Sequence, residues 1–361
     1  MRWDVFCRVI DNLGDAGVCW RLCADLAARG EAVRLLIDDV EPLSRIAPDG
    51  AAGVCVLRWH DDPPFDADLD VVIEAFGCDP PAAYVAEMAR SARAPVWINL
   101  EYLSAEPHAA RSHGLPSPQA SGPGRGLAKW FFYPGFSADA GGLLREPRLL
   151  AERAAFERDP WLRSIGCERT DDERVVVLFS YAHPGLPAWL RTLHAEPTLL
   201  LVPQGPAQTA VQRALGTPLR DGALRGHALG ALRARALDWL PQPQFDRLLW
   251  SADLNVVRGE DSLVRALWAG APFVWQLYPQ HDGVHRRKLQ AFLECWQAES
   301  RAPLPSGVAA LFAWWNAQQA DAPPPLPALA PWGDAVRGWR EQLAHQADLS
   351  SQLIGFVAAR R

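Results

Sequence analysis

The sequence contains few lysines, no paired cysteine motif and no apolar run of membrane-spanning length. Lys129 and Lys288 are its only lysines, although lysine and arginine together number 36, which we attribute to genomic base composition. The seven cysteines are scattered without a CxxC pair, so we expect reduced thiols and a cytoplasmic protein. Because no basic, apolar leader precedes the first predicted strand and no segment could cross a bilayer, we expect neither secretion nor membrane insertion.

Several ligand-binding motifs are also absent. Gly14 and Gly17 do not complete a GxGxxG fingerprint and no GK[ST] follows, which excludes the usual dinucleotide and Walker loops. The histidines lack metal-ligand spacing, and Asp66, Asp68 and Asp70 lie in a loop rich in proline and aspartate, so we predict no metal site. A net charge of -6 gives no overall attraction for nucleic acid, so an anionic ligand requires a local basic patch.

Short apolar runs alternate with helical patterns in two blocks. The runs are 3–10, 32–37, 54–59, 71–75 and 96–100 in the first block, and 175–180, 198–202, 234–240, 254–257 and 272–277 in the second. Continuous apolar strands separated by helices are typical of parallel sheets covered on both faces. We therefore predict an α/β fold of two Rossmann-like domains facing each other across a cleft, with ligands at the carboxyl ends of the strands.

The 361 residues are enough for two domains of ordinary size. We place the first domain at residues 1–165 and the second at 166–344. Residues 104–126, rich in proline, glycine and serine, are predicted to form a long surface loop of the first domain. The amphipathic segment from Asp334 onward is expected to pack back onto the first domain, with a returning helix at about 345–361. Its apolar residues are Trp339, Leu343, Leu349, Leu353 and Phe356.

The first apolar run ends in a turn that carries two carboxylates, Asp11 and Asp15, directly before a helical pattern. Backbone N–H groups at a helix start favour anions, and Gly14 and Gly17 allow a ligand to approach the main chain closely. A site for phosphate alone would not place two carboxylates there, so we interpret Asp11 and Asp15 as groups that accept a proton or stabilise a cation. The alternative is that one of them caps the helix, although capping does not require both.

A second strand–turn–helix pattern, at 254–270, combines an arginine with carboxylates and a hydroxyl group. Arg258 ends the predicted strand, and the N–H groups around Asp261 and Ser262 suit a pyrophosphate. Glu260 and Asp261 can accept hydrogen bonds from sugar hydroxyls. The structural alternative is a serine or aspartate cap on an ordinary helix, with Arg258 paired to an acid.

Aromatic and amide side chains near the same strand ends predict a nucleobase site. Gln242 and Phe245 follow the run 234–240, while Phe179 and Tyr181 lie at the end of the second block's first run. A nucleobase needs a stacking face and hydrogen bonds to its edge, and an amide supplies both a donor and an acceptor. Core packing is the alternative for any one of these aromatic residues, whereas their clustering at strand ends favours a site.

These motifs together are similar to those of one enzyme family. The similar segments are 11–20, 99–103, 129–136, 179–181, 241–242 and 258–265, the last continuing to 278–280. Over nearly its whole length the chain resembles the EarP family, the protein-arginine rhamnosyltransferases of elongation factor P, which are inverting glycosyltransferases of the GT-B fold. It differs from the family pattern at Ala16, where a larger aliphatic residue is usual, and at Trp239, where phenylalanine is usual.

The resemblance implies transfer of L-rhamnose from dTDP-β-L-rhamnose to an arginine of elongation factor P, without a cofactor or metal. It implies that Asp15 is the essential carboxylate and that Asp11 lies near the acceptor arginine. It also implies a set of residues that hold the dTDP moiety: Tyr181, Gln242, Phe245, Arg258, Glu260, Asp261 and Ser262.

Two other hypotheses remain open at this point. A sugar-nucleotide epimerase of the same fold would bind the same class of ligand but would need no protein acceptor. A non-catalytic sugar-nucleotide-binding protein would keep the turn at 258–262 and would have no use for both Asp11 and Asp15.

Overall fold

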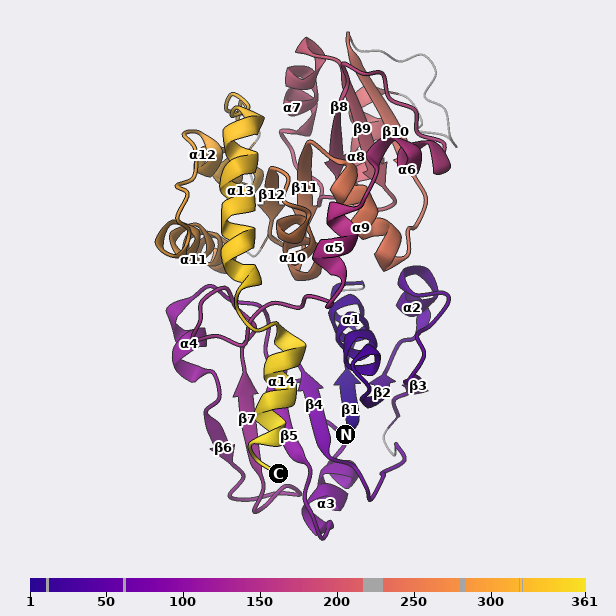
Figure 1. Cartoon of the computed structure of the whole chain (residues 1–361), viewed down its shortest axis with the longest axis vertical. Coiled ribbons are helices and arrows are strands. Elements are labelled where there is room, and N and C mark those ends of the chain that lie inside the picture. The colour runs from indigo at the N-terminus through magenta and orange to yellow at the C-terminus, as the bar shows by residue number, and fades with distance from the viewer. Residues whose placement is uncertain (11–12, 61–62, 217–229, 280–282, 318, 320) are drawn as a thin grey trace. The chain divides into compact units, whose positions relative to one another are not determined.

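The computed structural model describes residues 1–10, 13–60, 63–216, 230–279, 283–317, 319 and 321–361. Contacts divide the chain into two units, whose helices and strands are labelled in Figure 1. Unit 1 consists of residues 1–146 and 344–361, and unit 2 consists of residues 147–343. Residues 147–165, which the sequence analysis assigned to the first domain, thus lie in unit 2, where the Trp161 indole donates to Gln244 Oε1 at 2.9 Å.

A seven-stranded sheet forms the centre of unit 1, in the order β3-β2-β1-β4-β5-β7-β6. Its strands are β1 (Arg2–Cys7), β2 (Ala32–Ile37), β3 (Val54–Arg58), β4 (Val71–Ala75), β5 (Val96–Leu100), β6 (Pro116–Pro118) and β7 (Ala128–Phe132). Neighbouring strands are parallel except β6 and β7. The five apolar runs of the first block are therefore confirmed as parallel strands.

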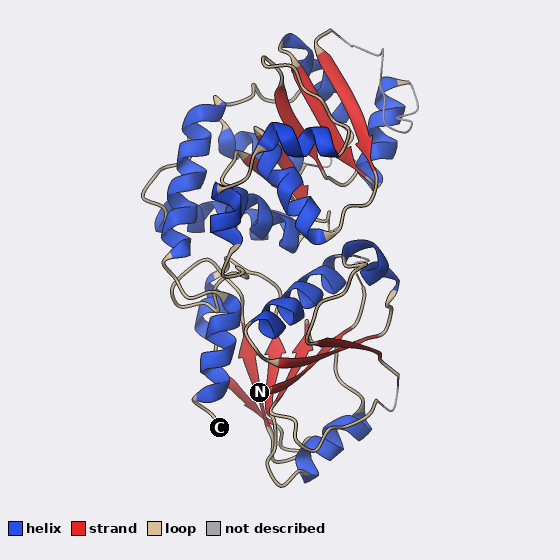
Figure 2. Cartoon of the chain, turned by 45° about the vertical axis from the view of Figure 1, so that its right-hand side comes forward, coloured by secondary structure: helices blue, strands red, loops and turns tan. Residues whose placement is uncertain are grey.

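Alternating side chains of this sheet enter two separate cores. Val5 of β1 joins a core that includes α1 (Gly14–Ala28) and α14 (Leu349–Ala358), whereas Phe6 joins a core with α3 (Ala82–Arg90). Helices therefore cover both faces of the sheet, as Figure 2 shows for unit 1. This explains why the central strands are mostly apolar, since both of their faces are buried. The remaining helices of unit 1 are α2 (Glu41–Ile46) and α4 (Pro107–Ser112).

Unit 2 contains a five-stranded parallel sheet in the order β10-β9-β8-β11-β12. Its strands are β8 (Arg174–Leu178), β9 (Thr198–Pro203), β10 (Leu232–Leu237), β11 (Leu254–Arg258) and β12 (Phe273–Gln276). Its helices are α5 (Leu149–Ala154), α6 (Arg158–Ser164), α7 (Leu186–Thr192), α8 (Pro206–Leu215), α9 (Gln242–Ser251), α10 (Glu260–Ala269), α11 (Val284–Glu299), α12 (Val308–Trp315) and α13 (Leu329–Ala344), with a short 3-10 helix at Leu193–Ala195. Both units thus have the predicted Rossmann-like α/β arrangement.

Two interpretations of loops and termini need correction. Residues 104–126 are not simply a surface loop, because they contain α4 and the edge strand β6, which pairs Pro116 with Trp130 of β7. Proline is tolerated there because an edge strand has a side without ladder partners. The segment after Asp334 divides between the units: Trp339 of α13 stacks on Trp296 at 4.6 Å in unit 2, whereas Leu353 of α14 is buried in unit 1.

Within the described ranges, no helix combines the length and the apolar character that a bilayer crossing requires.

A buried histidine, His183, predicts a pH dependence of the stability of unit 2. Its Nδ1 accepts from Gly185 N–H at 3.1 Å and its Nε2 donates to the Trp314 carbonyl oxygen at 3.0 Å, an arrangement that needs the neutral ring. Burial lowers the pKa of His183 below its ordinary value, although backbone carbonyls oppose this shift. The unfolded chain therefore binds the additional proton more readily, so this stability is complete above pH ~6.5 and is lost as the pH falls below that value.

Thermal unfolding of the parent and of His183→Gln between pH 5 and 8 measures this effect. The parent should lose stability more steeply than the variant below pH ~6.5. His60→Gln, at an exposed position of unit 1, is the control and should leave the slope unchanged. If the stabilities of the parent and of His183→Gln fall equally with decreasing pH, His183 is not the cause of the pH dependence.

Candidate active site

In unit 1, the carboxyl end of β1 leads into α1 and presents Asp15. This side chain is only 3% exposed, and its Oδ2 accepts a hydrogen bond from Ile10 N–H at 2.9 Å. The helix itself begins at Gly14, with Leu13 at the N-cap and no side-chain cap. Asp15 is therefore part of the first helical turn, and its side chain binds the backbone N–H group of Ile10 earlier in the chain. Asp11 lies outside the described residues.

The two glycines of this segment have helical roles. Gly14 is the first residue of α1, and the N–H of Gly17 donates to the Leu13 carbonyl oxygen at 2.9 Å. Neither glycine is among those with positive φ. Their contribution to a ligand site therefore rests on the small size of their side chains at the helix start rather than on an unusual backbone conformation.

Sequence reasoning missed two aromatic residues beside Asp15. The Tyr102 hydroxyl donates to Asp15 Oδ1 at 3.4 Å, and its ring is stacked on Phe76 with centroids 4.2 Å apart and an interplanar angle of 9°. Phe76 follows β4 and has a φ of 59°, a left-handed conformation that is costly for a bulky residue. Such strain commonly marks functional sites. Tyr102 lies in the similar segment 99–103, but the sequence did not indicate its contact with Asp15.

A polar network continues along the same edge of the sheet. Asn99 accepts from Gly77 N–H at 3.1 Å and donates from its side chain to Glu101 Oε1 at 2.8 Å. The buried carboxylate of Glu74 binds Lys129 Nζ at 2.7 Å. Burial raises the pKa of Glu101, and the Asn99 hydrogen bond opposes this shift. Unit 1 thus offers carboxylates and an aromatic pair at its carboxyl edge, which suits recognition of a cationic group.

In unit 2, Arg258 lies at the corresponding position, where β11 ends. Gly259 has a φ of 70°, which turns the chain into α10, and its carbonyl oxygen accepts from the Trp275 indole at 2.9 Å. Glu260 and Asp261 occupy the first turn of α10, and Ser262 is 7% exposed. The N-cap residue of this helix is Gly259, so neither Asp261 nor Ser262 occupies the N-cap position.

Two aromatic rings flank Arg258. Its guanidinium carbon is 4.8 Å from the centroid of Phe179 and 4.7 Å from that of Tyr181, while Phe245 contacts Phe179 edge-on at 5.0 Å. Phe179, Tyr181 and Phe245 are only partly buried, so they are not simply core residues. The backbone N–H of Tyr181 is held by Gln276 Oε1 at 2.9 Å. Contact with the two rings holds the guanidinium group at the end of β11, shortly before the start of α10.

Helices α9 and α10 are joined by a buried ion pair. Asp246 of α9 and Arg265 of α10 are 5% and 1% exposed, and both carboxylate oxygens are bound, at 2.9 Å by Nε and at 2.6 Å by an Nη. Gln242 begins α9 and Glu260 begins α10. The pair therefore fixes the helix starts that carry the predicted nucleobase and diphosphate residues.

Comparison with known proteins identifies the family. Residues 3–358 match the family described as elongation-factor P (EF-P) rhamnosyltransferase EarP. The chain belongs to the EarP family. A protein-arginine rhamnosyltransferase of Pseudomonas aeruginosa is 42% identical over 376 residues, which cover 99% of this chain and 98% of that relative.

Solved structures agree with this membership. A structure described as the basis for EarP-mediated arginine glycosylation of translation elongation factor EF-P matches with a TM-score of 0.68 and 31% identity, covering 100% of this chain and 99% of the other. The spinosyn rhamnosyltransferase SpnG, complexed with thymidine diphosphate, matches with a TM-score of 0.52 and 13% identity over 98% and 99%. The EarP chain described here is therefore a glycosyltransferase of the GT-B fold class, as the sequence analysis predicted.

Proposed function

We propose that this protein transfers L-rhamnose from dTDP-β-L-rhamnose to an arginine side chain of elongation factor P, with inversion to an α-linked rhamnosyl-arginine. The observation that carries the proposal is the 42% identity with a protein-arginine rhamnosyltransferase over 99% of the chain. Unit 1 supplies carboxylates for a guanidinium group, and unit 2 supplies an arginine and a helix start for a diphosphate. The two halves of the reaction thus have chemically suitable residues.

The acceptor arginine is a poor nucleophile because its guanidinium stays protonated and its lone pairs are delocalised. In our proposal Asp15, together with Asp11, binds the N–H groups, localises electron density on one nitrogen and accepts the proton as the new bond forms. Tyr102 positions Asp15 through its hydroxyl group, and the Phe76–Tyr102 pair offers a flat face to the cation.

The donor half of the reaction is a single displacement. As the arginine nitrogen attacks the anomeric carbon, the bond from that carbon to the diphosphate oxygen breaks and its electron pair leaves with dTDP. Arg258 and the N–H groups at the start of α10 stabilise this developing charge. Glu260 and Asp261 accept from sugar hydroxyls, Ser262 hydrogen-bonds the diphosphate, and the group of Gln242, Phe245, Phe179 and Tyr181 holds the thymine base.

The direct test is the intact mass of elongation factor P after incubation with this protein and dTDP-β-L-rhamnose. One added deoxyhexose, located on an arginine by peptide fragmentation, is the expected result. Reaction of the donor without elongation factor P would favour an epimerase instead. Binding of the donor without any reaction would indicate a non-catalytic binding protein.

Transfer should not depend on a divalent metal. The proposal assigns the leaving-group charge to Arg258 and backbone N–H groups, and within the described ranges no three histidine, cysteine or acidic side chains are grouped to hold a metal ion. Rates measured in EDTA should equal those in buffer. A loss of activity in EDTA that added Mg²⁺ restores would refute this part of the proposal.

Gln242→Ala should weaken dTDP binding by about 1 to 3 kcal/mol, because a buried base edge would lose its hydrogen-bonding partner. Gln244→Ala is a matched control on the same helix. The Gln244 side chain accepts from the Trp161 indole at 2.9 Å, so its loss should leave dTDP affinity unchanged. Calorimetric titration of both variants with dTDP measures these affinities. Equal affinities for the parent and Gln242→Ala would place the base elsewhere.

A further inference from the structure

A cavity of about 660 Å³ opens at the amino-terminal edge of the unit 2 sheet. Its lining includes Arg174 at the start of β8, Asp253 just before β11 and Pro272 just before β12. Because these strands are parallel, their amino ends share one edge, and Phe179 and Arg258 lie at the opposite edge. The cavity is therefore separate from the proposed nucleotide site, and its volume is typical of small-molecule sites.

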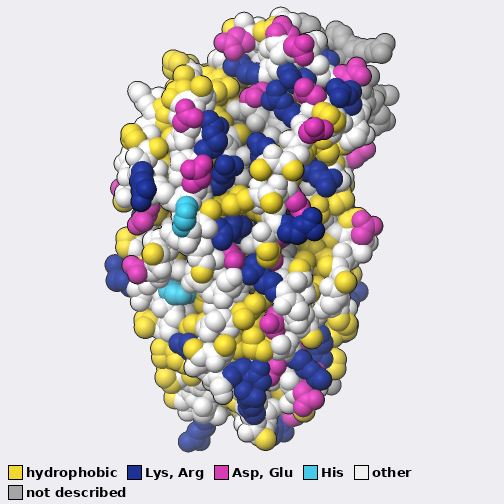
Figure 3. Space-filling view, viewed as in Figure 1, with side chains coloured by type: hydrophobic (Ala, Val, Ile, Leu, Met, Phe, Trp, Pro, Cys, Tyr) yellow, Lys and Arg dark blue, Asp and Glu magenta, His cyan; other side chains and the backbone are white. Residues whose placement is uncertain are grey.

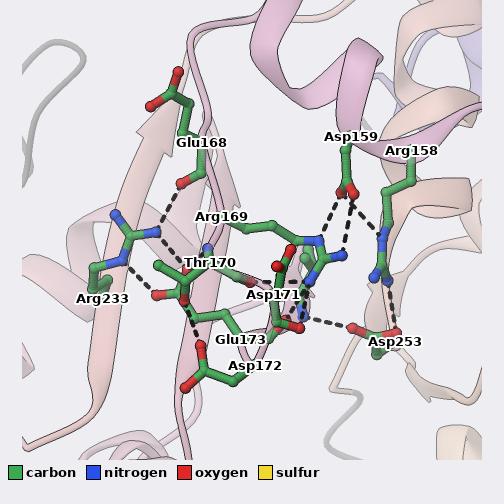
Figure 4. Close-up of polar contacts among 11 residues, drawn as sticks. Arg158, Asp159, Glu168, Arg169, Thr170, Asp171, Asp172, Glu173, Arg233 and Asp253 are labelled. Atoms are coloured by element: carbon green, nitrogen blue, oxygen red, sulfur yellow. Dashed lines mark hydrogen bonds and ion pairs between the residues drawn. The ribbon is translucent and has the colours of Figure 1, made fainter.

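Part of the lining consists of charged side chains that already have partners of opposite charge, as Figure 4 shows. Arg158 binds Asp253 at 2.8 Å, and Arg169 binds Asp159 at 2.7 Å. These pairs balance their own charges. The exposed carboxylates at 171–172, in the same part of the lining, disfavour an anion there. A ligand that binds by charge must therefore use another part of the cavity.

Three arginines gather around Gly270, where α10 ends. Arg153 of α5 and Arg337 of α13 line the cavity, and Arg153 Nε donates to the Ala269 carbonyl oxygen at 3.0 Å. A Cβ atom on Gly270 would collide with the guanidinium group of Arg340 and would lie 3.4 Å from Cγ of Arg337. All three side chains thus surround one short segment. Figure 3 shows basic side chains on this face of α13, mixed with a few acidic ones.

The positive charge of this cluster is only partly balanced. In the portion of the chain that the structure describes, no carboxylate lies within ion-pair distance of Arg153 or Arg340, and Arg337 pairs with the exposed Asp334 at 2.6 Å. Burial lowers the pKa of both Arg153 and Arg340, and neighbouring arginines lower it further, although Glu341 acts in the opposite direction on Arg340. The carbonyl end of α10 contributes only about half a negative charge.

We infer that Arg153 and Arg337, which line this cavity, bind a small phosphate-bearing anion together with Arg340, which lies beside Gly270 of the lining. Planar guanidinium groups match phosphate oxygens in pairs, and a multiply charged group relieves the repulsion among three arginines at once. The site has a structural consequence. Unit 2 begins at Pro147, just before α5, and ends at Leu343 of α13. An anion held by all three arginines therefore joins the segments by which the chain enters and leaves unit 2.

The test is calorimetric titration of the full chain with inorganic pyrophosphate. All proteins carry Arg258→Ala, which weakens pyrophosphate binding at the proposed nucleotide site, and any remaining binding there is the same in every variant, so differences among the variants do not depend on the proposed function. Arg153→Gln and Arg340→Gln are the test variants. Arg191→Gln, which removes an exposed charge of α7 outside the cavity, is the control. The test variants remove like-charge repulsion, so they should fold, which circular dichroism checks.

Each test variant should bind pyrophosphate about tenfold more weakly or worse, because each loses a charge-assisted hydrogen bond. The control should bind as tightly as its parent. Absence of binding at millimolar pyrophosphate, or equal affinity in the parent and the test variants, would overturn the site. Succinate serves as a second ligand of similar charge, and binding as tight as that of pyrophosphate would overturn the assignment to phosphate.

Discussion

Replacing Asp15 with asparagine should lower the rate of rhamnosyl transfer by about two to four powers of ten and leave dTDP affinity nearly unchanged. The substitution keeps the size of the side chain and an oxygen that can accept from Ile10 N–H. It removes the negative charge and the group proposed to accept the proton. The loss therefore falls on the transition state, whereas in the proposed mechanism the nucleotide is bound mainly by unit 2.

Asp38→Asn is a matched control for this experiment. Asp38 follows β2 and its Oδ1 accepts from Val9 N–H at 2.9 Å, so it supports the neighbouring backbone of the same turn. The Asp38→Asn variant also lacks one carboxylate charge, but we expect it to transfer rhamnose at nearly the parent rate. Donor affinity by titration and transfer rate by mass spectrometry are measured on the same folded samples. If Asp15→Asn is nearly as fast as Asp38→Asn, the role of Asp15 is structural.

Asp246→Ala should lower the free energy of unfolding of unit 2 by about 3 to 5 kcal/mol, because it leaves Arg265 buried without its partner. Arg265 is only 1% exposed, and two of its nitrogens are bound by the carboxylate of Asp246. Removing Asp246 takes the ion pair away from a guanidinium group that stays buried. Since the pair joins α9 to α10, the variant should also lose dTDP affinity.

Two comparison variants make this prediction specific. Asp334→Ala removes a carboxylate paired with Arg337 at 2.6 Å, but both side chains are exposed, so the cost should not exceed about 1 kcal/mol. Replacing Asp246 and Arg265 together by Leu and Met should cost less than Asp246→Ala alone, since no charge is left unpaired. Denaturant unfolding measures all three. A cost of Asp246→Ala as small as that of Asp334→Ala would show that the pair is solvated.

The strands could be predicted from the sequence because burial on both faces leaves a local signal, a continuous apolar run such as residues 175–178 of β8. Strand β6 has no such signal in its sequence, because Pro116–Pro118 becomes a strand only through pairing with β7. The amphipathic pattern around Trp339 correctly indicates a helix with one buried face. It does not indicate the partner of that face, which is Trp296 in unit 2.

In the candidate site, too, only the features with a local signal in the sequence could be predicted. The positions of Asp15 in the first turn of α1 and of Arg258 at the end of β11 could be predicted, because each lies in a strand–turn–helix segment that is contiguous in sequence. The stacking of Phe76 on Tyr102 could not, because the two residues follow different strands and meet only when β4 and β5 pair. The arginines around Gly270 come from two separate helices, Arg153 from α5 and Arg337 and Arg340 from α13, and nothing in the sequence indicates that these helices meet.

The position of α14 affects how the protein is made. Leu353 and Val357 belong to the core of unit 1, together with residues of β1 and α1, yet they are translated after all of unit 2. Domains usually fold in order of synthesis, the N-terminal one first. Here the nascent first unit keeps one apolar face open while the ribosome translates the second. Unit 2 can complete its core earlier, so we expect the N-terminal unit to be the later of the two to become resistant to protease during translation.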